Sequence, residues 1–114
     1  MQECIFCKII NREIPADIVY EDDCILAFKD IQPAAPTHLL FIPKKHIPTF
    51  FDLQPEDSHI LGKLQLAAAS VAKDMGLTER GFRLVSNCMK DAGQLVWHIH
   101  YHFLAGRTLQ WPPG

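Results

Sequence analysis

The sequence predicts an α+β fold: a five-stranded antiparallel sheet with one long helix and a short N-terminal helix. The predicted elements run in the order strands, long helix, strands, and their short connections favour an antiparallel sheet over a doubly wound one. A chain of 114 residues with 48% hydrophobic residues has enough apolar material for one core. Because no internal repeat or low-complexity segment is present, we expect a single domain over residues 1–114.

The first third of the chain predicts a short helical turn and three strands. The helical turn covers residues 8–12 and must end by Pro15, because proline lacks the amide hydrogen that a helix needs. The acidic segment 21–23 separates two apolar runs, which is typical of a hairpin, and Pro43 ends a third run. The predicted strands are residues 18–20, 24–28 and 37–42.

A long amphipathic helix is predicted between Pro55 and Gly76. Pro55 suits the first helical position, and the carboxylates that follow it oppose the positive end of the helix dipole. Apolar side chains then recur every three or four residues, so one helix face must pack on the sheet or on a second copy of the chain. Residues 82–86 predict a fourth strand, and residues 88–93 a loop that leads to the last strand.

The run from Val96 to Phe103 predicts the fifth strand, and it carries histidines at alternate positions. The period of two places the three imidazoles on one face, about 6.6 Å apart, while Trp97 and the other apolar residues face a core. Neutral imidazole can bind metal, attack as a nucleophile or carry a proton near neutral pH, so the row indicates a metal site or a reaction centre. The three histidines are His98, His100 and His102.

The composition excludes several classes of function. A formal net charge of −2 offers no bulk attraction for nucleic acid polymers or anionic membranes, which favours small phosphorylated ligands. No apolar stretch of about 18 residues and no signal-peptide pattern is present, so we expect a soluble, cytoplasmic protein with no membrane partner. Glycine-rich phosphate loops are also missing, and we expect no organic cofactor.

The four cysteines indicate a reducing compartment, because they lack the dense spacing of a secreted disulfide framework. Two of them, Cys4 and Cys7, form a Cys-x-x-Cys pair whose thiolates can converge on one metal ion. The pair is only half of such a site, and two buried thiols that pack as small apolar groups would have the same spacing.

Several separated motifs resemble the histidine triad (HIT) family, and in particular its Hint branch of purine nucleoside phosphoramidase-like proteins. The resemblance covers nearly the whole chain and implies the HIT fold as a single HIT domain. Besides the triad itself, the matching motifs are Asp30-Ile31-Gln32-Pro33, Ala35-Pro36-Thr37-His38, Ile42-Pro43-Lys44-Lys45-His46, Gly93-Gln94 and Trp111-Pro112-Pro113-Gly114.

The resemblance implies a nucleotide hydrolase that cleaves the P–N bond of purine nucleoside phosphoramidates or adenylylated amines. In the implied mechanism His100 attacks phosphorus and carries the nucleotide as a covalent intermediate, and His102 donates to a nonbridging phosphate oxygen. His38 belongs to a relay that orients the nucleophilic imidazole. His98 either joins that relay or binds metal. An imidazole suits both steps, because the phospho-imidazole bond that it forms is reactive enough for water to cleave.

The resemblance also implies the residues that surround the substrate, the metal and the partner. Family positions on the nucleoside side match Ile14, Phe28, Asp30 and Ile31, and those on the phosphate side match Asn87, Gly93 and Gln94. In a homodimer Trp111 of the C-terminal tail approaches the partner's active site. A structural zinc ion is implied at Cys4, Cys7, His46 and His98.

One departure from the family keeps alternatives open. Leu95 stands where Hint relatives commonly carry a small residue that can hydrogen-bond the phosphate or the leaving group. We therefore expect slower turnover or an altered leaving-group preference. The alternatives are a dinucleoside polyphosphate hydrolase of the Fhit kind and a nucleotide-binding module with little turnover.

Overall fold

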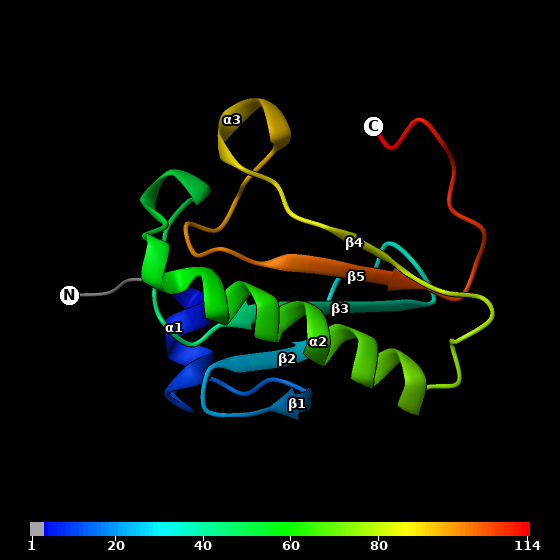
Figure 1. Ribbon diagram of the computed structural model, residues 1–114, viewed down its shortest axis with the longest axis horizontal. Helices are drawn as coiled ribbons and strands as arrows, with labels where there is room; N and C mark the ends of the chain where they lie inside the picture. The colour runs from blue at the N-terminus through cyan, green and yellow to red at the C-terminus, as the bar shows by residue number, and fades with distance from the viewer. Residues whose placement is uncertain (1–3) are drawn as a thin grey trace.

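The structure, a computed structural model, describes residues 4–114; the first three residues of the predicted domain lie outside the described part. The elements follow one another closely along the chain (Figure 1). They are α1 (Ile5–Ile10), β1 (Ile18–Glu21), β2 (Ile25–Lys29), β3 (Thr37–Pro43), η1 (Phe50–Asp52), η2 (Pro55–Asp57), α2 (Ser58–Asp74), β4 (Arg83–Val85), α3 (Met89–Ala92) and β5 (Tyr101–Ala105).

The five strands form one antiparallel sheet in the order β1-β2-β3-β5-β4. The long helix α2 crosses one face of this sheet, and the short helix α1 lies against the opposite face at one end (Figure 1). This arrangement confirms the predicted fold class. Within residues 4–114 no helix combines the length and the apolar character that crossing a membrane requires.

The central strand β3 is buried on both faces, and this explains its continuous apolar run. Leu39 and Phe41 pack with α2, whereas Leu40 and Ile42 pack with α1 on the opposite face. Successive side chains of a strand point to opposite faces, so one strand supplies both cores. The functional side chains described below lie on the α1 face.

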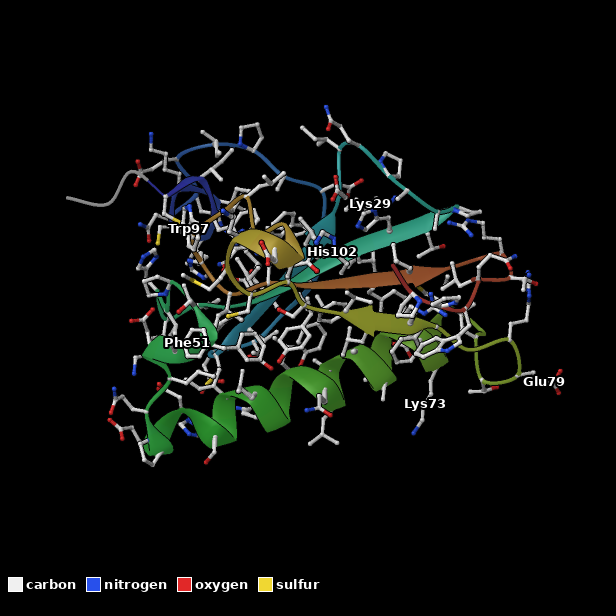
Figure 2. The ribbon with its side chains drawn as sticks, turned by 90° about the horizontal axis from the view of Figure 1, so that it is seen from above. Lys29, Phe51, Lys73, Glu79, Trp97 and His102 are labelled. Atoms are coloured by element: carbon white, nitrogen blue, oxygen red, sulfur yellow. The ribbon has the colours of Figure 1, made fainter. Side chains whose placement is uncertain are left out.

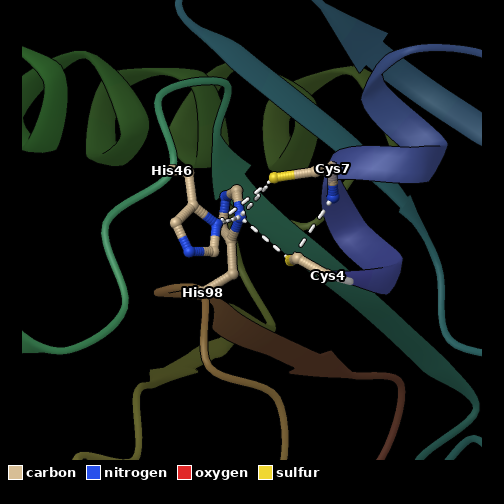
Figure 3. A group of neighbouring side chains, drawn as sticks. All are labelled: Cys4, Cys7, His46 and His98. Atoms are coloured by element: carbon tan, nitrogen blue, oxygen red, sulfur yellow. Dashed lines mark hydrogen bonds between the residues drawn. The ribbon is translucent and has the colours of Figure 1, made fainter. Parts of the chain in front are cut away.

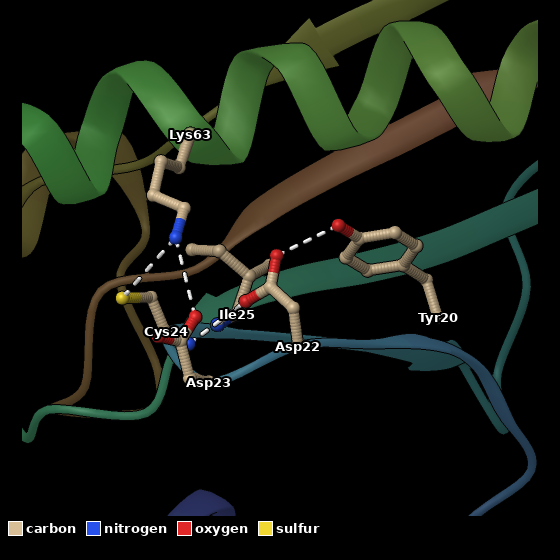
Figure 4. A network of polar contacts seen from close by, with 6 residues as sticks. All are labelled: Tyr20, Asp22, Asp23, Cys24, Ile25 and Lys63. Carbon is tan, nitrogen blue, oxygen red and sulfur yellow. Dashed lines mark hydrogen bonds and ion pairs between the residues drawn. The ribbon is translucent and has the colours of Figure 1, made fainter.

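The turn between β1 and β2 is held by its acidic residues (Figure 4). One oxygen of Asp22 accepts hydrogen bonds from the amides of Cys24 and Ile25, each at 2.8 Å, and the other accepts from the Tyr20 hydroxyl at 2.7 Å. The Lys63 ammonium of α2 pairs with the Asp23 carboxylate at 3.2 Å. The acidic segment therefore closes the hairpin and also ties it to the long helix.

The last strand starts later than predicted, at Tyr101 instead of Val96. The ladder between β3 and β5 ends at the pair Phe41 and Tyr101, and the amide of Ile99 donates instead to the Ile47 carbonyl at 2.8 Å. Pro43 has no amide hydrogen with which to extend the ladder. Trp97 consequently does not face the core; it is 48% exposed, at the same end of the molecule as α1 (Figure 2).

Other boundaries also differ from the predictions. The first helix covers Ile5–Ile10 instead of residues 8–12, because its apolar side chains pack on the sheet and the amide of Cys7 donates to the Cys4 sulfur at its start. The predicted loop over 88–93 contains α3, which ends at Gly93 with a positive φ of 88°. The first turn of the long helix is the 3₁₀ segment η2, so α2 itself begins at Ser58.

The substitution Leu64→Ala tests the core between α2 and the sheet, where Leu64 is 0% exposed. We expect the free energy of unfolding to fall by about 2 to 5 kcal/mol, because the change removes buried methyl groups and leaves a cavity. Urea denaturation measures the effect. The control is Leu95→Ala, the same deletion at a side chain that is 87% exposed, which should change stability by less than about 0.5 kcal/mol. Equal effects of the two changes would contradict the packing described.

Candidate active site

A cavity of about 510 Å³ opens on the α1 face of the sheet, and two of the triad histidines line it. Its walls come from α1, from the loop that follows β2, from the segment 93–96 and from the inward side chains of β2 and β3. Apolar side chains make most of the lining. The polar groups that reach it include Asp30, Asn87, His100 and His102.

The His100 ring is held in one protonation state by its surroundings. Its Nδ1 lies 2.8 Å from the carbonyl oxygen of His98, and since a carbonyl only accepts, Nδ1 carries the hydrogen. The ring is buried against the edge of Phe6, with centroids 5.1 Å apart, and burial lowers the pKa of His100. His100 is therefore neutral near pH 7, and its Nε2 keeps a lone pair.

A chain of hydrogen bonds fixes the His102 ring in the tautomer opposite to that of His100. The amide of Ala34 donates to Nδ1 of His38 at 2.9 Å, so in the neutral ring Nε2 of His38 carries the hydrogen. That Nε2 lies 2.9 Å from Nδ1 of His102 and donates to it. Because burial, reinforced by the neighbouring rings, lowers the pKa of His102, the ring is neutral and its hydrogen sits on Nε2.

Two adjacent imidazoles thus offer complementary chemistry at one cavity. The centroids of His100 and His102 are 5.2 Å apart. His100 supplies an unprotonated nitrogen, and His102 supplies an N–H donor. This pair could attack an electrophilic centre and stabilise negative charge on the oxygens around it.

A second cluster brings Cys4 and Cys7 of the N-terminal segment to His46 and His98 (Figure 3). The Cys4 and Cys7 sulfurs lie 3.5 and 3.7 Å from Nδ1 of His98, the Cys7 sulfur lies 3.2 Å from Nδ1 of His46, and the two Nδ1 atoms are 3.2 Å apart. A tetrahedral ion with ordinary Zn–S and Zn–N bonds would separate its ligands by about 3.4 to 3.8 Å. These four residues could therefore hold a metal ion.

The protonation of His98 also fits a ligand role. Its Nε2 lies 2.8 Å from the Pro43 carbonyl oxygen and donates to it, so Nδ1 presents a lone pair to the thiols. Burial lowers the pKa of His98 to about 4, and burial raises the pKa of the Cys7 thiol to about 11. A cation bound here would favour the thiolate form.

A third group, Asp30, His38 and His102, has its polar atoms within 4.8 Å of one another but does not offer a metal site of the same quality. Nε2 of His38 lies between Nδ1 of His102 and an oxygen of Asp30, at 2.9 and 3.4 Å. Because the Ala34 amide occupies Nδ1 of His38, this Nε2 must carry a hydrogen and has no lone pair for an ion. The group is a hydrogen-bonded relay.

The structure brings most of the sequence-predicted residues to the cavity. His38 contacts His102 and not His100, so it orients the donor ring instead of the expected nucleophile. His98 does not line the cavity; its ring faces the cysteines. The predicted substrate residues that line the cavity are Ile14, Phe28, Asp30, Ile31, Asn87 and Gly93.

Two predicted substrate residues lie elsewhere. The buried Gln94 side chain accepts from the amide of Met89 at 2.9 Å and donates to the carbonyls of Pro48 and Val96 at 2.7 and 3.1 Å. It therefore braces the segment that carries Gly93. Trp111 is 78% exposed, and its ring centroid lies 6.0 Å from the guanidinium carbon of Arg83.

Sequence reasoning missed the wall that α1 contributes. Phe6 and Ile9 line the cavity from this helix, Leu40 lines it from β3, and Val96 lines it from the segment before β5. The spacing of Phe6 and Ile9 on one helix face was a signal for burial, but nothing in it indicated which surface they cover. Leu95, where the sequence departs from the family pattern, lies at the rim of the cavity.

Comparisons with known proteins identify the family and agree with the fold. A family model described as the HIT domain matches residues 11–109. The chain is 51% identical over 108 residues to an Escherichia coli protein named purine nucleoside phosphoramidase, covering 95% of this chain and 91% of that protein. It is 54% identical over 113 residues to an uncharacterized HIT-like protein of Synechocystis, covering 99% and 98%. The crystal structure of a HIT family hydrolase from Legionella pneumophila has a TM-score of 0.95, with 54% identity and coverage of 98% and 100%.

The substitution Gln94→Glu tests the brace under the Gly93 segment. The carboxylate retains the shape of the side chain but places oxygen against the carbonyls of Pro48 and Val96, so we expect the free energy of unfolding to fall by about 1 to 3 kcal/mol. Urea denaturation at pH 7 measures it. The control Gln110→Glu makes the same change at an exposed side chain and should leave stability nearly unchanged. Similar stabilities for both variants would disprove the buried role of Gln94.

Proposed function

The chain belongs to the HIT domain family, and on that premise we propose that it is a hydrolase that cleaves the P–N bond of purine nucleoside phosphoramidates or adenylylated amines. One observation carries this proposal: a lone-pair nitrogen on His100 and an N–H donor on His102 at the same apolar cavity. The name of the Escherichia coli relative, purine nucleoside phosphoramidase, supports the substrate class.

In the proposed complex the nucleoside occupies the apolar part of the cavity. Ile14, Phe28 and Ile31 enclose the base, and the Asp30 carboxylate accepts hydrogen bonds from the ribose hydroxyls. The phosphate lies at the other end, near Asn87 and the backbone at Gly93. This orientation is supported by the lining of the cavity, because apolar side chains and the two histidines contribute to one continuous space.

The proposed reaction is a double displacement. In the first step Nε2 of His100 attacks phosphorus, a P–N bond to the ring forms, and the bond to the amine breaks as the amine takes up a proton from solvent. In the second step water attacks phosphorus and loses a proton to solvent, the P–N bond to the ring breaks, and the nucleoside monophosphate leaves with the ring restored. In both steps the Nε2–H group of His102 donates to a nonbridging oxygen and stabilises its negative charge.

The fixed tautomers support this division of roles. His100 cannot attack through Nδ1, because that nitrogen donates to the carbonyl of His98. His102 cannot attack through Nδ1, because that nitrogen accepts from His38. Each ring therefore presents one defined nitrogen to the substrate, and little rearrangement is needed before the reaction.

We also propose that the cluster of Cys4, Cys7, His46 and His98 binds structural zinc. Two thiolates and two imidazoles are a common tetrahedral ligand set, and a closed set leaves no coordination position for water. The distances between the four donor atoms support this assignment. The ion would attach the N-terminal helix to the segment that carries the triad.

The active form is proposed to be a cytoplasmic homodimer in which Trp111 of one chain reaches the partner's cavity. The exposed position of Trp111, away from its own cavity, supports a contact outside the chain. Leu95 at the rim is proposed to slow turnover or to alter the choice of leaving group, since its side chain cannot donate a hydrogen bond.

His100→Ala tests the reaction. With an adenosine phosphoramidate as substrate we expect kcat/KM to fall by at least about 10³-fold, because the nucleophile is removed. The control His59→Ala changes an exposed histidine outside the cavity and should retain full activity. Rapid-quench mass spectrometry should detect one nucleotidyl group on the wild type and none on the His100 variant. Faster cleavage of a diadenosine polyphosphate than of the phosphoramidate would instead favour the Fhit-like alternative.

Metal analysis of untagged protein tests the zinc site, and we expect about one zinc ion per chain. Cys7→Ser should lower the zinc content well below this level and lower the melting temperature, because one ligand of the ion is lost. Cys24→Ser is the control, since Cys24 lies outside the cluster and should keep both values. Zinc content well below one per chain in the wild type, with a melting temperature unaffected by a chelator, would exclude the site.

A further inference from the structure

Arg107 lies two residues after the end of β5 and reaches across to the loop between β2 and β3. Its guanidinium donates to the carbonyl oxygen of Ala34 at 3.0 Å, and also to its neighbour Thr108 at 3.1 Å. Within residues 4–114 no carboxylate forms an ion pair with this guanidinium. Its positive charge is therefore directed at backbone carbonyls, in hydrogen bonds stronger than neutral ones.

Ala34 is the residue through which this contact meets the candidate active site. Its amide donates to Nδ1 of His38 at 2.9 Å, and Nε2 of His38 donates to Nδ1 of His102 at 2.9 Å. The Ala34 backbone is thus bonded on both sides, by Arg107 at its carbonyl and by His38 at its amide. The surrounding loop, residues 30–36, contains no strand or helix. Its other hydrogen bonds are from the Asp30 amide to the His38 carbonyl at 3.0 Å and from the Gln32 amide to the Asp30 carboxylate at 2.8 Å.

The backbone before Arg107 is shaped for this approach. Gly106 has a φ of +97°, in the region that favours glycine, and a Cβ at this position would lie 2.8 Å from the Cβ of Pro36. The end of β5 therefore packs directly on the loop. Because of this close contact, the Arg107 side chain starts within reach of the Ala34 carbonyl.

The geometry points to Arg107 as a positioning residue that holds the Ala34 amide on His38 and thereby sets the tautomer of His102. Without the Ala34 amide, only the Asp30 carboxylate, 3.4 Å from Nε2 of His38, still favours hydrogen on that nitrogen. A His38 ring that carries the hydrogen on Nδ1 instead accepts at Nε2 from Nδ1 of His102. His102 in that state presents a lone pair to the cavity instead of an N–H group. The effect of Arg107 on turnover rests on the proposed function, in which the N–H group of His102 binds a phosphate oxygen.

The test combines kinetics with ¹⁵N NMR of histidine-labelled protein, in which protonated and unprotonated ring nitrogens have clearly different shifts. In Arg107→Met, which keeps a flexible, unbranched side chain but is shorter and has no donor, we expect a second tautomer of His38 and His102 to appear. We also expect kcat for an adenosine phosphoramidate to fall by about 10- to 100-fold with KM changed much less. Arg107→Lys, which keeps a charged donor, should restore part of the wild-type tautomer population and part of kcat. Arg80→Met is the matched control, an exposed arginine without a hydrogen bond in the described chain.

Wild-type tautomers in Arg107→Met would overturn the inference, whether or not kcat falls, because the effect would then not pass through His38. An altered tautomer with unchanged kcat would overturn it as well. If Arg107→Met does not fold, as judged by circular dichroism, Arg107→Leu, which also has no donor, is measured in its place. The NMR measurement needs no turnover, so failure of the proposed hydrolysis would be visible separately as an inactive wild type with the tautomers described.

Discussion

The site depends on one constraint: just before β5 the chain leaves the sheet, and His98 lies in this segment outside the ladder. Its ring contacts the two cysteines of the second cluster, while its backbone carbonyl accepts a hydrogen bond from Nδ1 of His100 at the cavity. Its Nε2 is fixed by the Pro43 carbonyl, so the residue cannot rotate without breaking a buried hydrogen bond. The protonation state of His100 is therefore tied to the backbone geometry that His98 imposes.

The rest of the fold supplies rigid surroundings for that arrangement. Because α2 covers one face of the sheet, the other face is available for α1 and the cavity. Because β3 pairs with β5, His38 lies diagonally across the ladder from His102: His38 is paired with Leu104 and His102 with Leu40. Backbone groups and buried rings fix both imidazoles, so the two nitrogens that face the cavity differ in chemistry although the residues are the same.

Much of the fold could be predicted because its strands and long helix have strong periodicity, and the triad itself indicated a metal site or a reaction centre. The start of the last strand could not be predicted. Residues 96–100 keep the alternating pattern of a strand, but β3 has no amide at Pro43 with which to continue the ladder. The roles of single side chains were harder to predict than the strands and helices. The family resemblance placed Gln94 at the substrate, but three hydrogen bonds direct its amide inward, and only the tertiary structure reveals them.

The small size of α1 has a consequence for the cavity that it borders. Six residues make fewer than two helical turns, and helices shorter than about 12 residues are only marginally stable in water. Its shape is thus maintained from outside, by the cysteine-histidine cluster at its start and by the apolar contacts of Phe6 and Ile9 with the sheet. A loss of those anchors would remove one wall of the cavity but leave the His100 and His102 pair in place, so binding in the cavity would weaken before the chemistry of the two rings changes.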